Sequence, residues 1–263
     1  MKHLARGFLV SSLLSGAIAA HADTLVYAAV GTGTNAGEFG ALDLNTGNFT
    51  SLGNLGFAPA GLGEVGSTVY TADPYTGKFY SVNAGTGAVT LISSSLPSVA
   101  MFGSTDSGLY EVSAAGELYS VSTSGSATDI GSLGLGTFPV TSPVSFDIST
   151  GGNTLYLTNG GSVYSISTST GAATLIGSLG NSAQTTAMLF ENDVLYGADP
   201  IHNKIDSINT ATGAATLGVG IAGANNGAIW GLAPSPVPLP AGAWLLLSGM
   251  VGLGAMSRRR VTA

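Results

Sequence analysis

The chain has 263 residues, no cysteine and only 8 % charged side chains, about a third of the share in an average globular protein. The absence of cysteine excludes disulfides, thiolate chemistry and metal sites with Cys ligands. Between Asp23 and Pro236, two lysines stand against 14 acidic side chains, a formal charge of −12, which leaves no basic face for a nucleic acid.

The first 22 residues have the three parts of a signal peptide in order. Lys2 and Arg6 precede an apolar stretch over 8–20, and the small-x-small motif Ala-His-Ala occupies 20–22. The apolar stretch is too short for a comfortable membrane span. A buried first helix is the alternative, but the ordered features favour export and removal of residues 1–22.

Residues 23–233 contain an internal repeat of about 40 residues. A glycine in a Thr/Ser-Gly-x-x-Thr turn recurs in steps of 40, 38, 46 and 42 residues, at Gly47, Gly87, Gly125, Gly171 and Gly213. A tyrosine that closes a short apolar pair recurs in the same phase, at Tyr27, Tyr70, Tyr110, Tyr156 and Tyr196. Tyrosines placed alike in every repeat indicate packing between sheets, although a sugar-stacking platform is the alternative reading.

Each repeat predicts four β-strands and no helix. In the second repeat the alternating apolar and polar runs are Gly61–Val65, Thr68–Ala72, Lys78–Asn83 and Ala88–Ser93. Turns rich in Gly, Asn, Ser and Thr separate them. Four strands in about 40 residues is the pattern of a propeller blade.

The first repeat lacks its first strand, since it begins at 24–27 with the second strand of the pattern. A matching strand occurs at the other end, at 228–232. We therefore expect an all-β fold, a five-bladed β-propeller of four-stranded blades closed by the C-terminal strand, which removes open sheet edges. An open β-solenoid and a six-bladed ring with one degenerate blade are the alternatives. Over about 24–234 the repeats resemble the L-Y…L-Y-S-V-x-x-x-T-G-x-x-T-L-I-G repeats of secreted bacterial β-propellers, which implies a fold but no activity.

The candidate ligand-binding residues are few. Asp73 and Asp199 occur at the same repeat position, each followed by Pro, and their carboxylates could bind Ca²⁺ or a sugar. Turn chemistry is the simpler explanation, because Asp accepts local N–H bonds and Pro favours turns. Tyr75, in the loop of Asp73, is the better aromatic candidate for contact with a ligand.

His202 is the single histidine of residues 23–233 and lies in a turn-forming sequence. No G-x-S-x-G elbow, H-E-x-x-H motif or EF-hand pattern accompanies it. We expect His202 to be a solvated loop residue, and it is also a candidate for contact with a ligand. The sequence predicts no catalytic residue, no metal ligand and no cofactor.

The C-terminal end predicts a membrane segment. Residues 234–240 form a Pro-rich linker, and Leu239 to Met256 is apolar and close to the minimum length of a spanning helix. Three arginines follow at once, and clustered Arg favours the cytoplasmic side: Arg258, Arg259 and Arg260. A buried core helix is the alternative. We expect residues 241–263 to be a transmembrane helix with a cytoplasmic tail, and the domain to lie outside the cytoplasmic membrane.

This tail resembles the PEP-CTERM sorting signals of Gram-negative bacteria. The match covers residues 237–260, and its VPLPA variant of the motif, with Leu in place of Glu, is Val237, Pro238, Leu239, Pro240 and Ala241. The resemblance implies processing by an exosortase-type protease, and an organism that makes extracellular polysaccharide or biofilm matrix.

Together these features predict a non-enzymatic, exported protein of the cell surface or extracellular matrix, anchored at least transiently, whose propeller binds polysaccharide or an envelope protein. One alternative is an extracellular carbohydrate-active enzyme with carboxylates at the ring centre, although the expected inner strands offer Glu64 and little else. Convergence of three or more ionisable groups there would favour it. The other alternative is a calcium-dependent adhesin that uses Asp73 and Asp199.

Overall fold

A computed structural model describes residues 25–138, 146–180, 184–225 and 227–235. They form 20 β-strands and one 3-10 helix at Gly33–Asn35, so the expected all-β fold is confirmed for this part of the chain. Within the same residues, no helix has both the length and the apolar character needed to cross a membrane. The predicted signal peptide, sorting motif and C-terminal helix lie outside the described residues.

The strands follow one another with short connections. Their bounds are β1 Leu25–Val30, β2 Glu38–Asp43, β3 Phe49–Asn54, β4 Leu62–Val65, β5 Thr68–Asp73, β6 Lys78–Val82, β7 Val89–Ser93, β8 Val99–Thr105, β9 Gly108–Ser113, β10 Glu117–Val121, β11 Ala127–Ser132, β12 Phe146–Thr150, β13 Leu155–Asn159, β14 Ser162–Ile166, β15 Ala173–Ser178, β16 Ala187–Glu191, β17 Val194–Asp199, β18 Lys204–Ile208, β19 Ala215–Gly220 and β20 Ile229–Pro234. The four strands expected in the second repeat agree with β4 to β7 to within one residue at each end.

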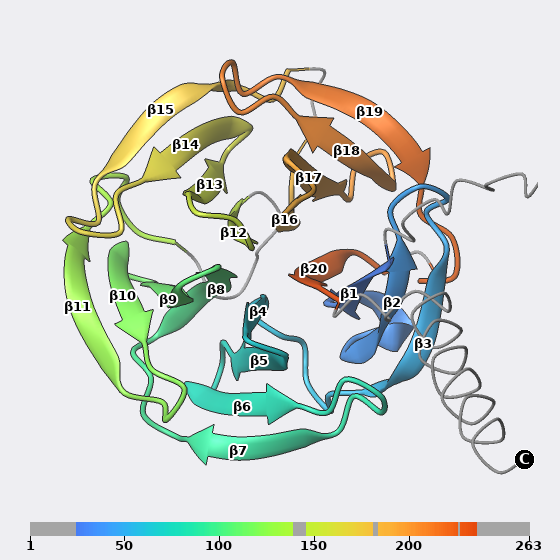
Figure 1. Cartoon of the computed structure of the whole chain (residues 1–263), viewed down its shortest axis with the longest axis horizontal. Helices are drawn as coiled ribbons and strands as arrows, with labels where there is room; N and C mark the ends of the chain where they lie inside the picture. The colour runs from blue at the N-terminus through green and yellow to red at the C-terminus, as the bar shows by residue number, and fades with distance from the viewer. Residues whose placement is uncertain (1–24, 139–145, 181–183, 226, 236–263) are drawn as a thin grey trace, which may run out of the picture.

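The strands form a ring of sheets (Figure 1), with β4, β8, β12, β16 and β20 nearest the centre. Three sheets have four strands, in the orders β20-β1-β2-β3, β4-β5-β6-β7 and β11-β10-β9-β8. The fourth sheet has eight strands, because the meanders β12–β15 and β16–β19 are joined by a parallel pair between β12 and β16. The buried carboxylate of Asp147 supports this junction by accepting a hydrogen bond of 2.6 Å from the backbone N–H of Met188.

The last strand completes the first sheet. β20 pairs antiparallel with β1, and Ala28 lies opposite Leu232. The predicted pairing of the C-terminal strand with the first repeat is therefore confirmed. This pairing links the two ends of the described domain. It also covers the edge that β1 would otherwise expose.

The core consists of clusters between neighbouring sheets. Phe39 of β2 packs with Leu62 and Val69 of the next sheet. Phe79 packs in the same way with Phe102 of β8, at a ring-centroid distance of 5.7 Å. Tyr70 joins this cluster and stacks on Phe79, so the expected packing role of the repeated tyrosine is confirmed there.

The repeated glycine has a positive φ in all five turns, between 68° and 84°. Each of these turns joins the third and fourth strands of its repeat and lies against the outer strand of the preceding repeat. A Cβ on Gly171 would be 2.3 Å from the carbonyl oxygen of Gly131, and one on Gly47 would be 2.0 Å from that of Gly220. Only glycine fits both the conformation and the contact.

Candidate functional site

One end of the ring holds a cavity of about 340 Å³, here called the acidic mouth. It lies where the five central strands β4, β8, β12, β16 and β20 end, since each of these strands, or the turn after it, contributes to the lining. The lining residues are Glu64, Gly66, Ser104, Thr105, Asp106, Gly151, Phe190, Glu191 and Pro234. None of them is Lys, Arg or His, so no cation among the described lining residues offsets the negative charge.

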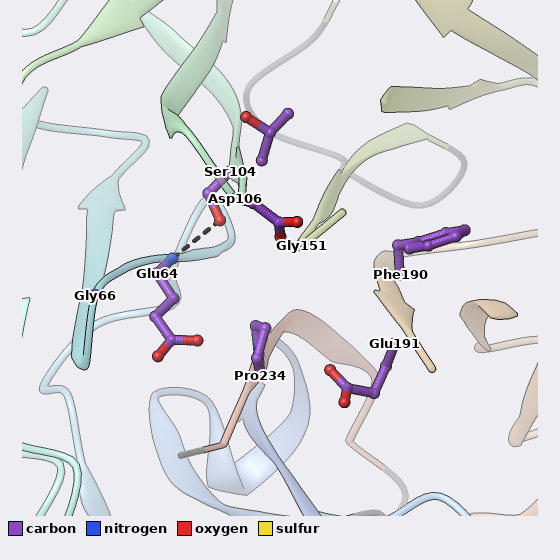
Figure 2. A pocket seen from close by; sticks show the side chains of 9 residues that line it. Glu64, Gly66, Ser104, Asp106, Gly151, Phe190, Glu191 and Pro234 are labelled. Carbon is purple, nitrogen blue, oxygen red and sulfur yellow. Dashed lines mark hydrogen bonds between the residues drawn. The ribbon is translucent and has the colours of Figure 1, made fainter. Parts of the chain in front are cut away.

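Three carboxylates surround this cavity: Figure 2 shows Glu64 and Glu191 on either side of Pro234, and Asp106 across from them. Asp106 is held in place because its Oδ1 accepts a hydrogen bond of 2.7 Å from the backbone N–H of Gly152. The backbone at Glu64 is held by a bond of 3.0 Å from its N–H to Ser104 Oγ. The carboxylates thus stand on fixed backbone positions.

Two carboxyl groups of the acidic mouth, Glu64 and Glu191, have raised pKa values. Burial raises the pKa of Glu64 to about 7, and the charge of Glu191 contributes in the same direction. Burial also raises the pKa of Glu191, with a smaller contribution from the charge of Asp106. Carboxyl groups that exchange a proton near neutral pH can act as hydrogen-bond donors or acceptors, or as a general acid or base.

The sequence-based expectation that the central strands offer Glu64 and little else is wrong. Glu191 ends β16, and Asp106 follows β8. The position of these residues within their repeats was a usable signal. The repeated tyrosines Tyr70, Tyr110 and Tyr196 pair with residues of the central strands, namely Gly63, Gly103 and Leu189. Each acidic residue of the mouth follows one of these three partners within three positions. Counting from that pairing would have placed all three carboxylates at the same end of the ring.

The predicted candidates Asp73 and Asp199 lie at the other end, as the last residues of β5 and β17, directly before the turns. Asp73 accepts bonds from the backbone N–H of Tyr75 (2.9 Å) and from Thr76 Oγ1 (2.6 Å). Asp199 accepts a bond of 2.8 Å from the backbone N–H of Ile201. Both carboxylates stabilise their own turns, and these turns belong to different sheets. Among the described residues, no three Asp, Glu, His or Cys side chains are grouped so that they could hold a metal ion.

The other two candidates share these turns. Tyr75 is 59 % exposed and free to meet a ligand. His202 lies in the turn after β17, as predicted, and its side chain is 32 % exposed, but its Nδ1 is 2.6 Å from Asp199 Oδ2. It is therefore a partner of Asp199 and not a fully solvated side chain. Neither residue lies with the three carboxylates of the mouth.

A second cavity of about 330 Å³, here called the seam cavity, lies beside the turn of His202. Its lining residues are Thr32, Thr186, Pro200, Asn203, Gly227, Ala228 and Trp230. Trp230, on the closing strand β20, is buried, and its Nε1 has no hydrogen-bond partner among the described residues. The two hydroxyls are occupied by backbone bonds, Thr32 with Ala228 and Thr186 with Ile229.

No family model matches this chain, and no curated protein matches it either. Among solved structures, a chain of a nidogen/laminin complex is 11 % identical, with a TM-score of 0.52 over 81 % of this chain and 85 % of that chain. A virginiamycin B lyase from Staphylococcus aureus is 17 % identical, covering 74 % of this chain and 69 % of that one at a TM-score of 0.45. A protein of unknown function from Bacteroides thetaiotaomicron is 18 % identical, covering 60 % and 42 % at 0.43. The first similarity supports a β-propeller-like fold and carries no activity with it.

Proposed function

We propose that this protein is an exported, non-enzymatic β-propeller of the cell surface or extracellular matrix, which binds a neutral or basic polysaccharide at the acidic mouth. The observation that carries the proposal is the convergence of Glu64, Asp106 and Glu191 on one cavity that no described cation lines. Carboxylates accept short, charge-assisted hydrogen bonds from hydroxyl and ammonium groups, which are the donors that such a polysaccharide offers.

We count five blades, with β12–β15 and β16–β19 as two blades of the eight-stranded sheet. Five clusters of buried side chains support this count, because each combines residues of two successive four-stranded units. The cluster with Val26, Leu42 and Leu189 includes the contact between the last unit and the first. A ring of this kind brings the ends of five strands to one opening, which suits a binding site.

The charge of the domain limits the class of polysaccharide. With two lysines against 14 acidic side chains, the domain repels acidic polymers at neutral pH. Phe190 and Pro234 add apolar surface beside the carboxylates, and sites for sugars combine such surface with a few polar groups. A neutral or basic chain therefore fits better than an acidic one.

Export and sorting complete the proposal. The signal peptide at 1–22 and the VPLPA motif at 237–241 make the protein a substrate for an exosortase-type protease, with the propeller outside the cytoplasmic membrane. Mass spectrometry of the mature protein tests this part. A mature form that begins near Asp23 and lacks the residues after the motif supports it, and a form with both ends intact contradicts it.

Binding is tested with the full chain on immobilised dextran (neutral), chitosan (basic) and alginate (acidic). We expect retention on dextran or chitosan, none on alginate, and at least tenfold weaker retention for the double variant Glu64→Gln, Glu191→Gln. Asp129→Asn is the matched control, because it removes a carboxylate from the outer strand β11. Absence of retention on every polymer, or an equal loss in the control, refutes the proposal.

A carbohydrate-active enzyme is the second candidate, and two observations favour it. The first is the convergence of Glu64, Asp106 and Glu191 on one cavity, which was the condition set for this alternative. The second is the titration of Glu64. Burial raises the pKa of Glu64 to about 7, a value suited to a general acid or base at neutral pH, and Glu191 supplies the second carboxylate that glycoside hydrolysis uses. Release of reducing ends from a retained polymer, abolished in Glu64→Gln, would replace the binding proposal with this one.

A further inference from the structure

A smaller cavity of about 220 Å³ adjoins the acidic mouth and is here called the side cavity. Its lining residues are Asn153, Thr154, Tyr156, Phe190 and Asp193. Phe190 lines both cavities. The two cavities therefore lie on either side of this residue.

The same two turns border both cavities. The turn between β12 and β13 contributes Gly151 to the mouth and Asn153 to the side cavity. The end of β16 contributes Glu191 to the mouth, and the turn that follows it contributes Asp193 to the side cavity. The side cavity thus lies on the side of the mouth toward β13, the second strand of its unit, which contributes Tyr156.

The two turns are held in fixed relation to each other. The parallel pair of Thr150 with Leu189 lies directly before both of them. Within the first turn, a Cβ on Gly152 would be 2.6 Å from Cδ1 of Phe190, so the turn backbone lies against the ring. In the second turn, Asp193 has a φ of 63°, a conformation that fixes a tight turn. A groove with such walls is largely formed before any ligand arrives.

An aromatic pair connects the two cavities. Phe190 and Tyr156 are stacked with ring centroids 6.2 Å apart and an interplanar angle of 21°. In Figure 2 the ring of Phe190 points away from the carboxylates of the mouth. Both rings are only half-buried. Aromatic faces of this kind bind the apolar faces of sugar rings, and the side chains of Asn153, Thr154 and Asp193 offer polar contacts beside them.

We infer that the acidic mouth and the side cavity form one groove for at least two successive units of a polysaccharide chain. One unit lies among the carboxylates, and the next lies over Phe190 and Tyr156 toward the rim. This inference rests on the proposed polysaccharide binding. It adds the direction in which the polysaccharide chain runs and the number of units that the groove holds. A single sugar unit fills only one of the two cavities, so affinity rises with chain length until both are occupied.

Calorimetric titration of the full chain with glucose oligomers (from dextran) and glucosamine oligomers (from chitosan), each of one to six units, tests the groove. We expect the Kd to fall at least tenfold between one unit and three units. In Tyr156→Ala this gain is lost, because the second unit loses its aromatic contact. If Tyr156→Ala fails to fold, Asn153→Ala replaces it as the test, because Asn153 lies at the surface of the turn. This variant is expected to reduce the gain in affinity severalfold.

Tyr110→Ala is the matched control, because Tyr110 occupies the same repeat position in β9 and lines neither cavity. It should keep the full dependence on chain length. A Kd that is the same for one unit and six units overturns the groove but leaves binding at the mouth intact. Absence of binding to every oligomer and to both parent polymers overturns the groove together with the proposed function.

Discussion

The backbone of Gly213, in the turn between β18 and β19, lies directly on the backbone of Gly177 in β15. A Cβ on Gly213 would be 2.8 Å from the carbonyl carbon of Gly177, and a Cβ on Gly177 would be 2.0 Å from the carbonyl oxygen of Thr212. Similar approaches join Gly171 to Gly131 and close the ring between Gly47 and Gly220. The spacing of successive units at the rim is therefore set by backbone contacts.

The first prediction concerns this contact. Gly177→Ala should lower the free energy of unfolding by about 2–4 kcal/mol, because the methyl group would have to displace backbone and not a flexible side chain. Chemical denaturation measures the change. Gly134→Ala, where only the positive φ of 73° is unfavourable, should cost about 1 kcal/mol. Gly108→Ala has open space and should be close to neutral, so equal losses at Gly177 and Gly108 would contradict the prediction.

The second prediction concerns a buried acid. Glu111 is fully buried, both its carboxylate oxygens lack a hydrogen-bond partner among the described residues, and burial raises its pKa from 4.5 to about 8. The folded state therefore binds the proton more tightly than the unfolded state, and this contribution to stability is complete below pH 4.5 and is lost as the pH rises to about 8.

Glu111→Leu, which copies Leu157 at the same repeat position, should remove this dependence. Above pH 8 the variant should be more stable than the natural protein by on the order of 5 kcal/mol. Denaturation series from pH 4 to pH 9 measure the difference. Parallel curves for the two proteins over this range would show that Glu111 does not titrate as described.

The third prediction concerns the coupling within the acidic mouth. Glu191→Gln should lower the pKa of Glu64 but leave it above 4.5, because burial is the larger cause of the shift and remains. The carbon-13 chemical shift of the Glu64 carboxyl group during a pH titration measures this. Asp193→Asn, which removes the neighbouring carboxylate of the same turn, is the control and should leave the Glu64 titration unchanged. An equal shift in both variants would mean that the effect is not specific to Glu191.

The fourth prediction concerns the seam between the first and last strands. A Cβ on Gly31 would be 1.8 Å from Cδ2 of Trp230, so the indole lies flat against that glycine. Gly31→Ala should expel the indole, lower the midpoint of thermal unfolding and shift the tryptophan emission to longer wavelength. Trp244→Phe in the same chain leaves Trp230 as the single tryptophan, which is excited selectively at wavelengths above the tyrosine absorption. An unchanged emission maximum would show that the indole keeps its place.

The fifth prediction separates turn chemistry from cation binding at Asp199. Asp199→Ala removes acceptors for the backbone N–H of Ile201 and for His202, and should cost about 1–2 kcal/mol. Asp199→Asn keeps one acceptor oxygen and should cost less. Calcium or a chelator should leave the Tm of the natural protein unchanged. A rise of several degrees with calcium, absent in Asp199→Asn, would favour the adhesin alternative.

Much of the fold was predictable from local pattern. The alternation in residues such as Lys78 to Val82 follows the pleat of a strand, and the recurring glycines mark turns that need a positive φ. The offset of the first repeat correctly predicted that β20 pairs with β1. The parallel junction of β12 and β16 was not predictable, because it joins two repeats through contacts that no periodicity marks, among them the bond from the N–H of Met188 to Asp147.

The candidate site was predicted poorly for a related reason. Asp73 and Asp199 stand out in the sequence because they occupy the same position in two repeats. They recur because the same turn recurs and needs a local hydrogen-bond acceptor. Glu64, Asp106 and Glu191 do not repeat, and they lie up to 127 positions apart along the chain (64 to 191). Only the closed arrangement of the sheets brings these three together.

By itself, therefore, the sequence determined the strands, the turns, their phase and the pairing of the two ends, because these depend on periodicity and on the conformations that single residues allow. It also predicts export and sorting, because the motifs proposed for these are linear and need no fold. Tertiary structure alone decided that the three carboxylates line one cavity and how deeply each is buried. Those properties depend on contacts between distant segments and on the burial of charge, and neither is encoded in local pattern.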